Sequence, residues 1–195
     1  MASIRYNKDK INDVFKYVDI KRFGPFATVY EGNQYFDTWN FSISEIFHFI
    51  DRDIFLLTKS EQLPSMEYQA RSKGDGPTNK ISLTILDIQE DILNHNFILS
   101  KAREFSAEGL SDNFVKKYYR DIFNELGHYI LMKLNQELWK YNYESITTCD
   151  DEVIYYKKRF HHSVHFSTGL INREFKRVTC KCPELKMKQC FQVTL

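Results

Sequence analysis

The stretch that decides the fold is SDNFVKKYYRDIFNELGHYILMKLNQELWKYN, residues 111–142. Apolar residues recur in it every three or four positions from Val115 to Leu138, which is the spacing of one face of an α-helix. Ser111 precedes this pattern and is a residue type that favours the N-cap of a helix. Because additional aromatic and aliphatic residues widen the apolar stripe, the sequence predicts one long helix over residues 111–142 that is largely buried.

On the C-terminal side of this helix the apolar period changes. From Val153 onward apolar residues alternate with polar ones, which predicts three or four antiparallel strands up to the C-terminus. Earlier in the chain KISLTILDI, residues 80–88, is largely apolar on both faces and is typical of a central strand. We therefore predict an α+β fold over residues 1–195, a single domain with the long helix packed against an antiparallel sheet that the C-terminal strands complete.

The N-terminal part gives weaker signals. Apolar residues at helical spacing predict a short helix over residues 11–18. Residues 26–42 fit a hairpin with its turn at Glu31-Gly32-Asn33, and residues 43–57 fit a helix or a buried strand, with a helix favoured for their first half. Residues 64–80 contain two prolines and two glycines and no apolar period, which predicts a mobile loop.

Length and composition indicate an ordinary folded protein. The 195 residues suffice for one domain, and the 43% hydrophobic and 27% charged residues are typical of folded chains. The first residues are charged where a signal peptide needs an apolar run, and no stretch approaches the roughly 18 apolar residues of a membrane span. We expect a soluble, cytoplasmic or otherwise intracellular protein with free thiols and no membrane partner. Its Lys, Ile, Asn, Tyr and Phe content also suits an AT-rich genome, such as that of many viruses and phages.

Charge is distributed unevenly along the chain. The net charge is +1, but residues 151–195 hold nine basic and four acidic residues, which gives this part +5 and leaves −4 for residues 1–150. A basic C-terminal part on an acidic body indicates a charged partner.

Histidines and cysteines gather in the same C-terminal part: His161, His162, His165, Cys180, Cys182 and Cys190. If residues 153–168 form one strand, the first and third of these histidines lie about 13 Å apart on one face, too far for one zinc ion with bonds of about 2 Å. A turn at residues 161–162 would remove this argument. Strand pairing also directs the last cysteine to the opposite face from the other two. We predict no metal site and no cofactor.

Catalytic motifs are scarce. The sequence contains no phosphate-binding glycine loop, no H-E-x-x-H and no G-x-S-x-G. One arrangement could serve a Mg²⁺-dependent nuclease: Asp151 and Glu174 would hold the ion and Lys176 would polarise water, with Glu137 or Glu144 completing the set. The competing interpretation is charge pairing on a solvated strand face. We favour a non-enzymatic protein and keep the nuclease as an alternative.

Cations and aromatic rings alternate along the predicted C-terminal strands and form a basic, aromatic surface. Its expected binding residues are Tyr155, Lys157, Arg159, His161, His165, Arg173, Phe175, Arg177 and Lys181. Tyrosine and arginine are favoured anchors at protein interfaces, whereas exposed rings and cations also suit bases and phosphates. We predict that this surface binds a host or cognate protein, as an inhibitory or accessory factor would, with RNA or DNA as the alternative ligand. The sequence predicts no oligomeric state.

Overall fold

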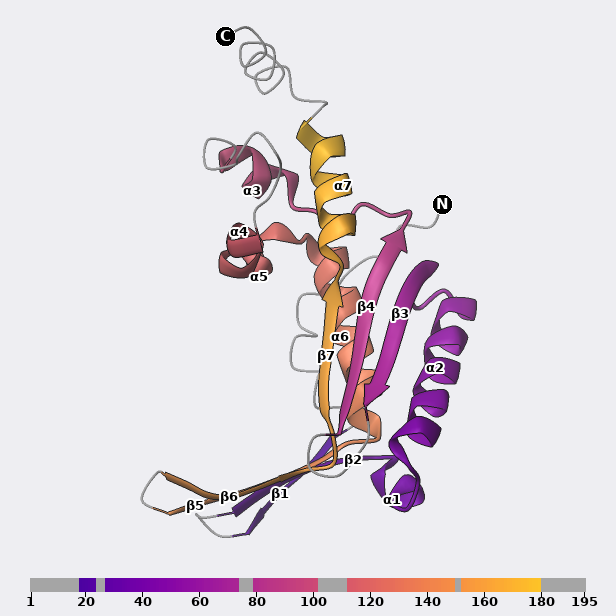
Figure 1. Ribbon diagram of the computed structural model, residues 1–195, viewed down its shortest axis with the longest axis vertical. Helices are drawn as coiled ribbons and strands as arrows, with labels where there is room; N and C mark the ends of the chain where they lie inside the picture. Colours follow the sequence, from indigo (N-terminus) through magenta and orange to yellow (C-terminus); the bar gives the residue numbers. More distant parts are fainter. Residues whose placement is uncertain (1–17, 24–26, 74–78, 102–111, 150–151, 180–195) are drawn as a thin grey trace, which may run out of the picture. The chain divides into compact units, whose positions relative to one another are not determined.

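The computed structural model describes residues 18–23, 27–73, 79–101, 112–149 and 152–179 (Figure 1). Over these ranges the chain forms helices and two sheets, which confirms the predicted α+β fold with an antiparallel sheet. The chain divides into two compact units. Of the described residues, those within 18–64, 69–83 and 131–164 form the first unit, and those within 65–68, 84–130 and 165–179 form the second. That these residues form one domain stays a prediction.

The elements follow one another along the chain in a mixed order. The strands are β1 (Val18–Phe23), β2 (Ala27–Gly32), β3 (Met66–Lys73), β4 (Lys80–Ile88), β5 (Tyr143–Cys149), β6 (Glu152–Lys158) and β7 (His161–Phe166). The helices are α1 (Tyr35–Thr38), α2 (Ile43–Lys59), α3 (His95–Ser100), α4 (Asp112–Lys117), α5 (Tyr119–Ile122), α6 (Glu125–Lys140) and α7 (Thr168–Thr179).

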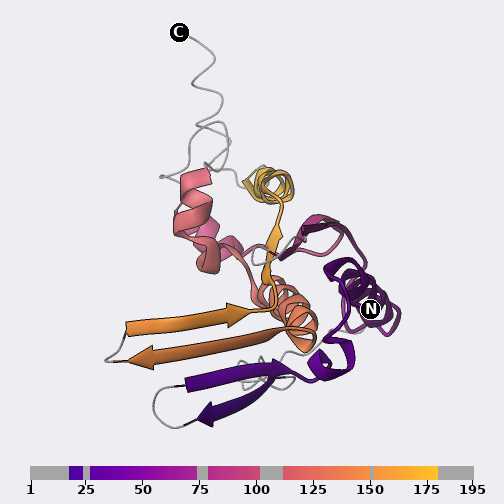
Figure 2. The same ribbon diagram turned by 60° about the horizontal axis from the view of Figure 1, so that its bottom comes forward.

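The first unit contains a four-stranded antiparallel sheet in the order β1-β2-β5-β6 (Figure 2). The predicted hairpin over residues 26–42 is wrong, because β2 pairs with β1 and β5, and the chain enters α1 after Gly32. A Cβ at Gly32 would overlap the main-chain carbonyls of Trp139 and Lys140, so only glycine lets β2 end against α6. The Gly32 N–H donates to the Asn142 carbonyl at 2.9 Å.

The helix predicted over residues 11–18 lies outside the described residues except for Val18, which begins β1.

Helix α2 confirms the helical interpretation of residues 43–57. Its N-terminus is a capping box, in which the Ser42 hydroxyl accepts from the Glu45 N–H at 3.2 Å and the Glu45 carboxylate accepts from the Ser42 N–H at 2.8 Å. The helix buries isoleucines spaced three and four residues apart, which supply much of the core of the first unit: Ile43, Ile46, Ile50 and Ile54.

The predicted helix over residues 111–142 is interrupted. Phe123 takes an extended conformation and forms a β-bridge with Leu93, and the Asn124 N–H donates to the Ile92 carbonyl at 3.0 Å. The Asn124 side chain then accepts from the Gly127 N–H at 3.0 Å and starts α6. The apolar stripe predicted from sequence is buried in α6, but α4 and α5 are separate short helices before it.

The loop predicted over residues 64–80 is also wrong over most of its length. Residues 66–73 form β3, in which Met66, Tyr68 and Ala70 are partly buried and alternate with exposed polar residues. Residues 74–78 lie outside the described residues. Strand β4 confirms the central strand predicted over residues 80–88, since it lies between β3 and β7 in the three-stranded sheet.

The C-terminal part contains two strands and a helix. Strand β6 belongs to the four-stranded sheet and β7 to the other sheet, so the chain changes sheets at Arg159-Phe160. Strand β7 runs beside β4 in the same direction, with the His161 N–H donating to Asn79 and the Ser167 N–H donating to Ile85, both at 2.8 Å (Figure 1). The prediction of antiparallel strands through to the C-terminus is therefore wrong beyond β6.

Residues 168–179 form α7, a helix where we predicted strands. Its buried residues have helical spacing and are Leu170, Ile171, Glu174, Phe175 and Val178. Residues 180–195 lie outside the described residues.

Candidate binding surface

The predicted basic, aromatic surface is not one surface. Lys157 is exposed on β6, whereas His161 and His165 are exposed on β7 in the other sheet. Phe175 is buried in α7. Tyr155 lies in β6, but its side chain is outside the described part of the structure, and so is all of Lys181. The alternation that grouped these residues therefore combined two sheets and a helix.

Arg159 is a structural residue. Its guanidinium donates to the Thr38 hydroxyl at 3.0 Å, to the Tyr141 carbonyl at 2.9 Å and to the Thr38 carbonyl. It also lies over the Tyr35 ring, with 5.2 Å between the guanidinium carbon and the ring centroid. These contacts turn Arg159 inward and tie the corner between β6 and β7 to α1, so its guanidinium is not a surface cation.

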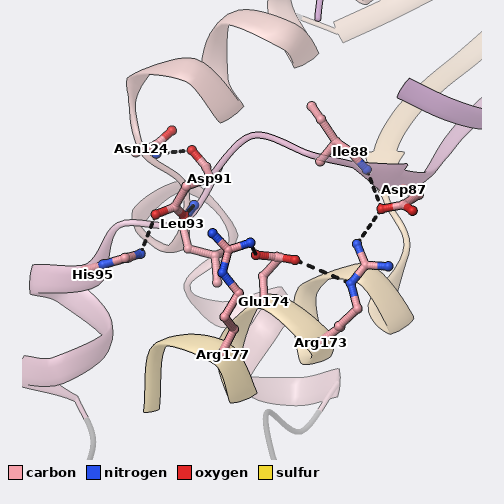
Figure 3. A network of polar contacts seen from close by, with 9 residues as sticks. All are labelled: Asp87, Ile88, Asp91, Leu93, His95, Asn124, Arg173, Glu174 and Arg177. Atoms are coloured by element: carbon pink, nitrogen blue, oxygen red, sulfur yellow. Dashed lines mark hydrogen bonds and ion pairs between the residues drawn. The ribbon is translucent and has the colours of Figure 1, made fainter. Parts of the chain in front are cut away.

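Arg173 and Arg177 remain exposed on α7, but both are paired. Glu174 is buried, and its carboxylate contacts Arg173 Nε at 3.4 Å and Arg177 Nη1 at 3.1 Å (Figure 3). Arg173 also contacts Asp87 at 2.5 Å, and this hydrogen bond is the main reason that the pKa of Asp87 is lowered. The network joins α7 to the end of β4 within the second unit, and both arginines take part in it.

The nuclease arrangement does not form as predicted. Glu174 and Lys176 lie on a helix and not on a strand, and Glu174 is occupied by the two arginines. Asp151 lies outside the described residues. Of the two proposed additional glutamates, Glu137 is buried in α6 against Lys140, and Glu144 pairs with Lys158 at 3.1 Å. The Glu174 carboxylate, which we predicted would hold Mg²⁺, therefore has a structural role.

The histidines have three different surroundings. His161 is exposed, and the His165 ring nitrogen lies 3.0 Å from the Thr84 hydroxyl. His162 is partly buried between Trp139 and Phe160, with its Nδ1 3.2 Å from Asn142 Nδ2. The pKa of His162 is lowered to about 4, mainly because the ring is buried and secondly because the positive charge of Lys158 lies nearby. His162 is therefore neutral at pH 7.

A metal site has no support among the histidines and acidic residues whose positions are described. Nowhere in residues 18–23, 27–73, 79–101, 112–149 and 152–179 do three histidine, cysteine, aspartate or glutamate side chains meet as ion ligands would. Cys180, Cys182 and Cys190 lie outside these ranges.

The four-stranded sheet is covered only near one end. On one face Trp139 packs on Tyr30 with ring centroids 6.5 Å apart. On the other face Tyr35 of α1 stacks on Tyr143 at 4.9 Å. Figure 2 shows that α1 and α6 meet the sheet where β2 ends and β5 begins, and that the strands extend away from these helices. In β1 every residue after Val18 is exposed, so the far part of the sheet has no covering layer within the described residues.

Strand register places the side chains of each face. Lys21 pairs with Val29, Val29 with Ser145, and Ser145 with Lys157, so these four side chains form one row on one face. The next row begins with Phe23, Ala27 and Thr147. We call this surface the Phe23 face and define it by Lys21, Phe23, Ala27, Val29, Ser145, Thr147 and Lys157.

Large apolar side chains are exposed around the Phe23 face. Phe23 is 61% exposed; at the covered end of the sheet Phe36 of α1 is 64% exposed, and Trp39, the residue that follows α1, is 68% exposed. The Lys21 ammonium lies 5.4 Å from the centroid of the Phe36 ring, so Phe36 adjoins the row of the Phe23 face that contains Lys21. Exposed apolar clusters of this kind mark interaction surfaces. The side chains that β2 and β5 contribute to the Phe23 face are small. The exposed rings and the lysines Lys21 and Lys157 are therefore its largest groups.

Sequence reasoning missed most of these residues. Among the described side chains that define the Phe23 face, Lys157 is the one that was also a predicted binding residue; Tyr155, another predicted residue, pairs with Thr147 in the strand register. The signal for β1 was present, because Val18–Phe23 precedes a Gly-Pro turn dipeptide and a second run of β-prone residues. Assigning Val18 to a helix concealed it.

Charge on the sheet is balanced. The strands β1, β2, β5 and β6 contain as many acidic as basic residues: Asp19, Glu31, Glu144 and Glu152 against Lys21, Arg22, Lys157 and Lys158. Two of these pairs are ion pairs, Lys21 with Glu31 at 3.2 Å and Lys158 with Glu144 at 3.1 Å. A surface that binds nucleic acid relies on an excess of positive charge, which these strands lack.

Comparison with known proteins assigns no family. No protein-family model matches the sequence, and no curated protein and no solved structure matches it. In the described part of the chain, the helices are too short or too polar to cross a membrane.

Proposed function

We propose that this chain is a non-enzymatic binding protein that holds a partner protein against the Phe23 face. The observation that carries the proposal is the exposure of Phe23 on a part of the sheet that no described element covers, together with the exposure of Phe36 beside Lys21 and of Trp39 directly after α1. Aromatic side chains at the centre of an interface contribute much of its binding energy. The partner would be a host or cognate protein inside the cell, and the chain would act by occupying it.

The balanced charge of the sheet favours a protein over a nucleic acid. Lys21 already pairs with Glu31, which leaves Lys157 as the one lysine of the Phe23 face that makes no ion pair within the described residues. A face with exposed rings and a single lysine that lacks an ion pair within the described residues suits a protein surface with apolar pockets and a peripheral carboxylate. It would give only a small electrostatic contribution to binding a phosphate backbone.

A photocrosslinking experiment tests the proposal. The chain would be made with p-benzoylphenylalanine in place of Phe23, and irradiated in extracts of the cells that naturally contain it. The same substitution at Phe55 is a matched control, because Phe55 is 56% exposed but belongs to α2 and not to the Phe23 face. Substitution at Tyr156, 46% exposed on the opposite face, tests which face is used. We expect one protein to crosslink from position 23 and not from the two controls.

Affinity then decides whether the crosslink reports function. The crosslinked protein would be purified and titrated with the wild-type chain and with the variants Phe23→Ser, Trp39→Ser and Phe55→Ser. We expect the first two to weaken binding by at least about tenfold and the third to leave it unchanged. Equal crosslinking from all three positions, or unchanged affinity in all variants, would overturn the proposal.

Nucleic-acid binding is the competing outcome. The purified chain would be titrated with single- and double-stranded RNA and DNA at low and moderate salt. Binding that falls by roughly 0.9 log units per log unit of salt for each contacted duplex phosphate, and that Lys157→Glu abolishes, would replace the protein partner with a nucleic acid.

A further inference from the structure

Strand β1 has an open edge. It is the first strand in the order β1-β2-β5-β6, and no described strand pairs with its outer side. An open edge presents backbone N–H and C=O groups that can pair with another strand. The edge is long enough for such pairing, since residues 19–23 are all exposed and extended.

The side chains of β1 are complementary to themselves. Two copies of an antiparallel strand related by a twofold axis pair residue i with residue j so that both side chains lie on the same face. With Ile20 on the axis, Asp19 of each copy lies opposite Lys21 of the other, and Ile20 meets Ile20. Opposite charges and apolar pairs directly across two strands are stabilising, and like charges are destabilising.

Neighbouring registers lack this match. Moving the axis to Asp19 sets two carboxylates opposite each other, and moving it to Lys21 or Arg22 sets two cations opposite each other. Charged residues on an edge strand normally discourage pairing. In β1 they discourage every register centred between Asp19 and Arg22 except the one centred on Ile20.

The electrostatic surroundings of Asp19 favour a positively charged neighbour. Within the described residues it makes no ion pair, and the residue directly across from it on β2 is Glu31, which carries the same charge. Lys21 of its own chain contacts Glu31 at 3.2 Å. A second lysine brought in by another copy would lie beside Asp19 and relieve this repulsion. Ile20, an apolar side chain that is 44% exposed, would be covered in the same step.

We propose that two copies of this chain associate through β1 in the antiparallel register centred on Ile20, which joins their four-stranded sheets into one. The edge contact alone is smaller than the roughly 1,200 Å² of a stable interface, so we expect a weak dimer that dissociates on dilution. The proposal concerns the edge of the sheet and does not depend on what the Phe23 face binds.

Charge-swapped variants test the register. Asp19→Lys makes both edge charges positive. Lys21→Glu combined with Glu31→Lys makes both edge charges negative while keeping an ion pair between β1 and β2. In sedimentation experiments from about 1 to about 500 µM we expect the wild-type chain to dimerise and each variant alone to associate at least about tenfold more weakly. An equimolar mixture should dimerise, because every facing pair is then opposite in charge.

A control and a second measurement complete the test. Asp37→Lys makes the same change in net charge at an exposed position of α1 and should leave dimerisation unchanged. With the native cysteines replaced by serine, oxidation should link two chains through Ile20→Cys but not through Arg22→Cys, whose copies would lie about 13 Å apart along the strands. Circular dichroism would verify that each variant is folded.

The results separate this proposal from the proposed function. A wild-type chain that stays monomeric over the whole range overturns the dimer, and so does a dimer that is insensitive to the charge swaps or that the mixture fails to restore. Crosslinking from the Phe23 face is measured with a different protein and can succeed or fail independently of these outcomes.

Discussion

Arg159 and Thr38 are joined by two hydrogen bonds, one of 3.0 Å from the guanidinium to the Thr38 hydroxyl and one to its carbonyl. The same guanidinium donates to the Tyr141 carbonyl at 2.9 Å. These bonds fix the corner at which the chain leaves the four-stranded sheet and begins β7.

The first prediction concerns this corner. Arg159→Lys loses the planar fork of donors and leaves carbonyls without partners, so we expect it to reduce the free energy of unfolding by about 2 kcal/mol. Lys157→Ala, two residues away and exposed, should change it by less than about 0.5 kcal/mol. Urea denaturation followed by circular dichroism measures both. Equal effects would mean that Arg159 is a surface residue, as the sequence had predicted.

The second prediction concerns pH. His162 has an ordinary pKa of 6.5 and a folded-state pKa of about 4, so the unfolded chain binds its proton more tightly. The stability that a neutral His162 provides is complete above pH 6.5, is lost as the pH falls from 6.5 to 4, and amounts to at most about 3 kcal/mol. His162→Gln can still accept from Asn142 and should remove this part of the pH dependence.

The control for the pH experiment is the neighbouring histidine. His161 is exposed, and its charge contributes least to the lowered pKa of His162, so His161→Gln should change the loss of stability between pH 6.5 and 4 much less than His162→Gln does. Unfolding free energies at several pH values give the comparison directly. A wild-type curve that is flat over this interval would contradict the burial of the neutral imidazole.

The third prediction uses two glycines. Gly32→Ala places a Cβ against the main-chain carbonyls of Trp139 and Lys140, which cannot move independently of α6, and we expect a loss of about 3 kcal/mol or more. At Gly169, by contrast, the nearest atom to an added Cβ is the Ser167 hydroxyl at 4.0 Å. Because alanine favours helix over glycine, Gly169→Ala should be neutral or stabilising by up to about 1 kcal/mol. Thermal melts of both variants check the contrast.

The fourth prediction concerns the buried carboxylate of α6. Burial raises the pKa of Glu137, and the ion pair with Lys140 opposes this shift. Lys140→Met leaves the carboxylate buried without its cation and should cost about 3 kcal/mol. The double variant Lys140→Met/Glu137→Gln removes the charge as well and should recover at least half of that loss. A double variant that is no more stable than the single one would contradict the pairing.

Periodicity predicted the elements whose burial follows one simple rule. The isoleucines of α2, the apolar stripe of α6 and the strand β4 each match a single period, and each forms as expected or nearly so. The break before α6 could not be read from the stripe, because it depends on the pairing of Phe123 with Leu93. That contact joins residues far apart in the chain.

Helix α7 shows why the prediction of strands in the C-terminal part was wrong. Its buried face includes Glu174, which a hydrophobic pattern counts as a surface residue. Without that position, Arg173, Phe175 and Arg177 fit strand alternation as well as they fit a helix. The carboxylate is buried because two arginines on its own helix accompany it, and such pairing is invisible to a two-letter pattern.

The candidate surface was missed for a related reason. A basic residue in an alternating run was taken to be exposed, but exposure depends on which element packs against it. Arg159 is covered by α1, whereas Phe23 is left open because no described element covers it. From residue type alone, an aromatic ring is expected to be buried and a cation to be exposed. Phe23 and Arg159 have the opposite arrangement.

The order of the strands in the four-stranded sheet affects how the protein is made. Strands β1 and β2 are synthesised early, but β2 pairs with β5, as in Ala27 with Thr147. A hairpin of two strands is marginally stable in water, so β1 and β2 remain an unfinished ribbon until β5 and β6 leave the ribosome. During that interval the apolar side chains of Ile20 and Phe23 lie on a two-stranded ribbon and not on a completed sheet. Because closing so long a loop is slow, we expect these two side chains to stay exposed during folding until the sheet is completed.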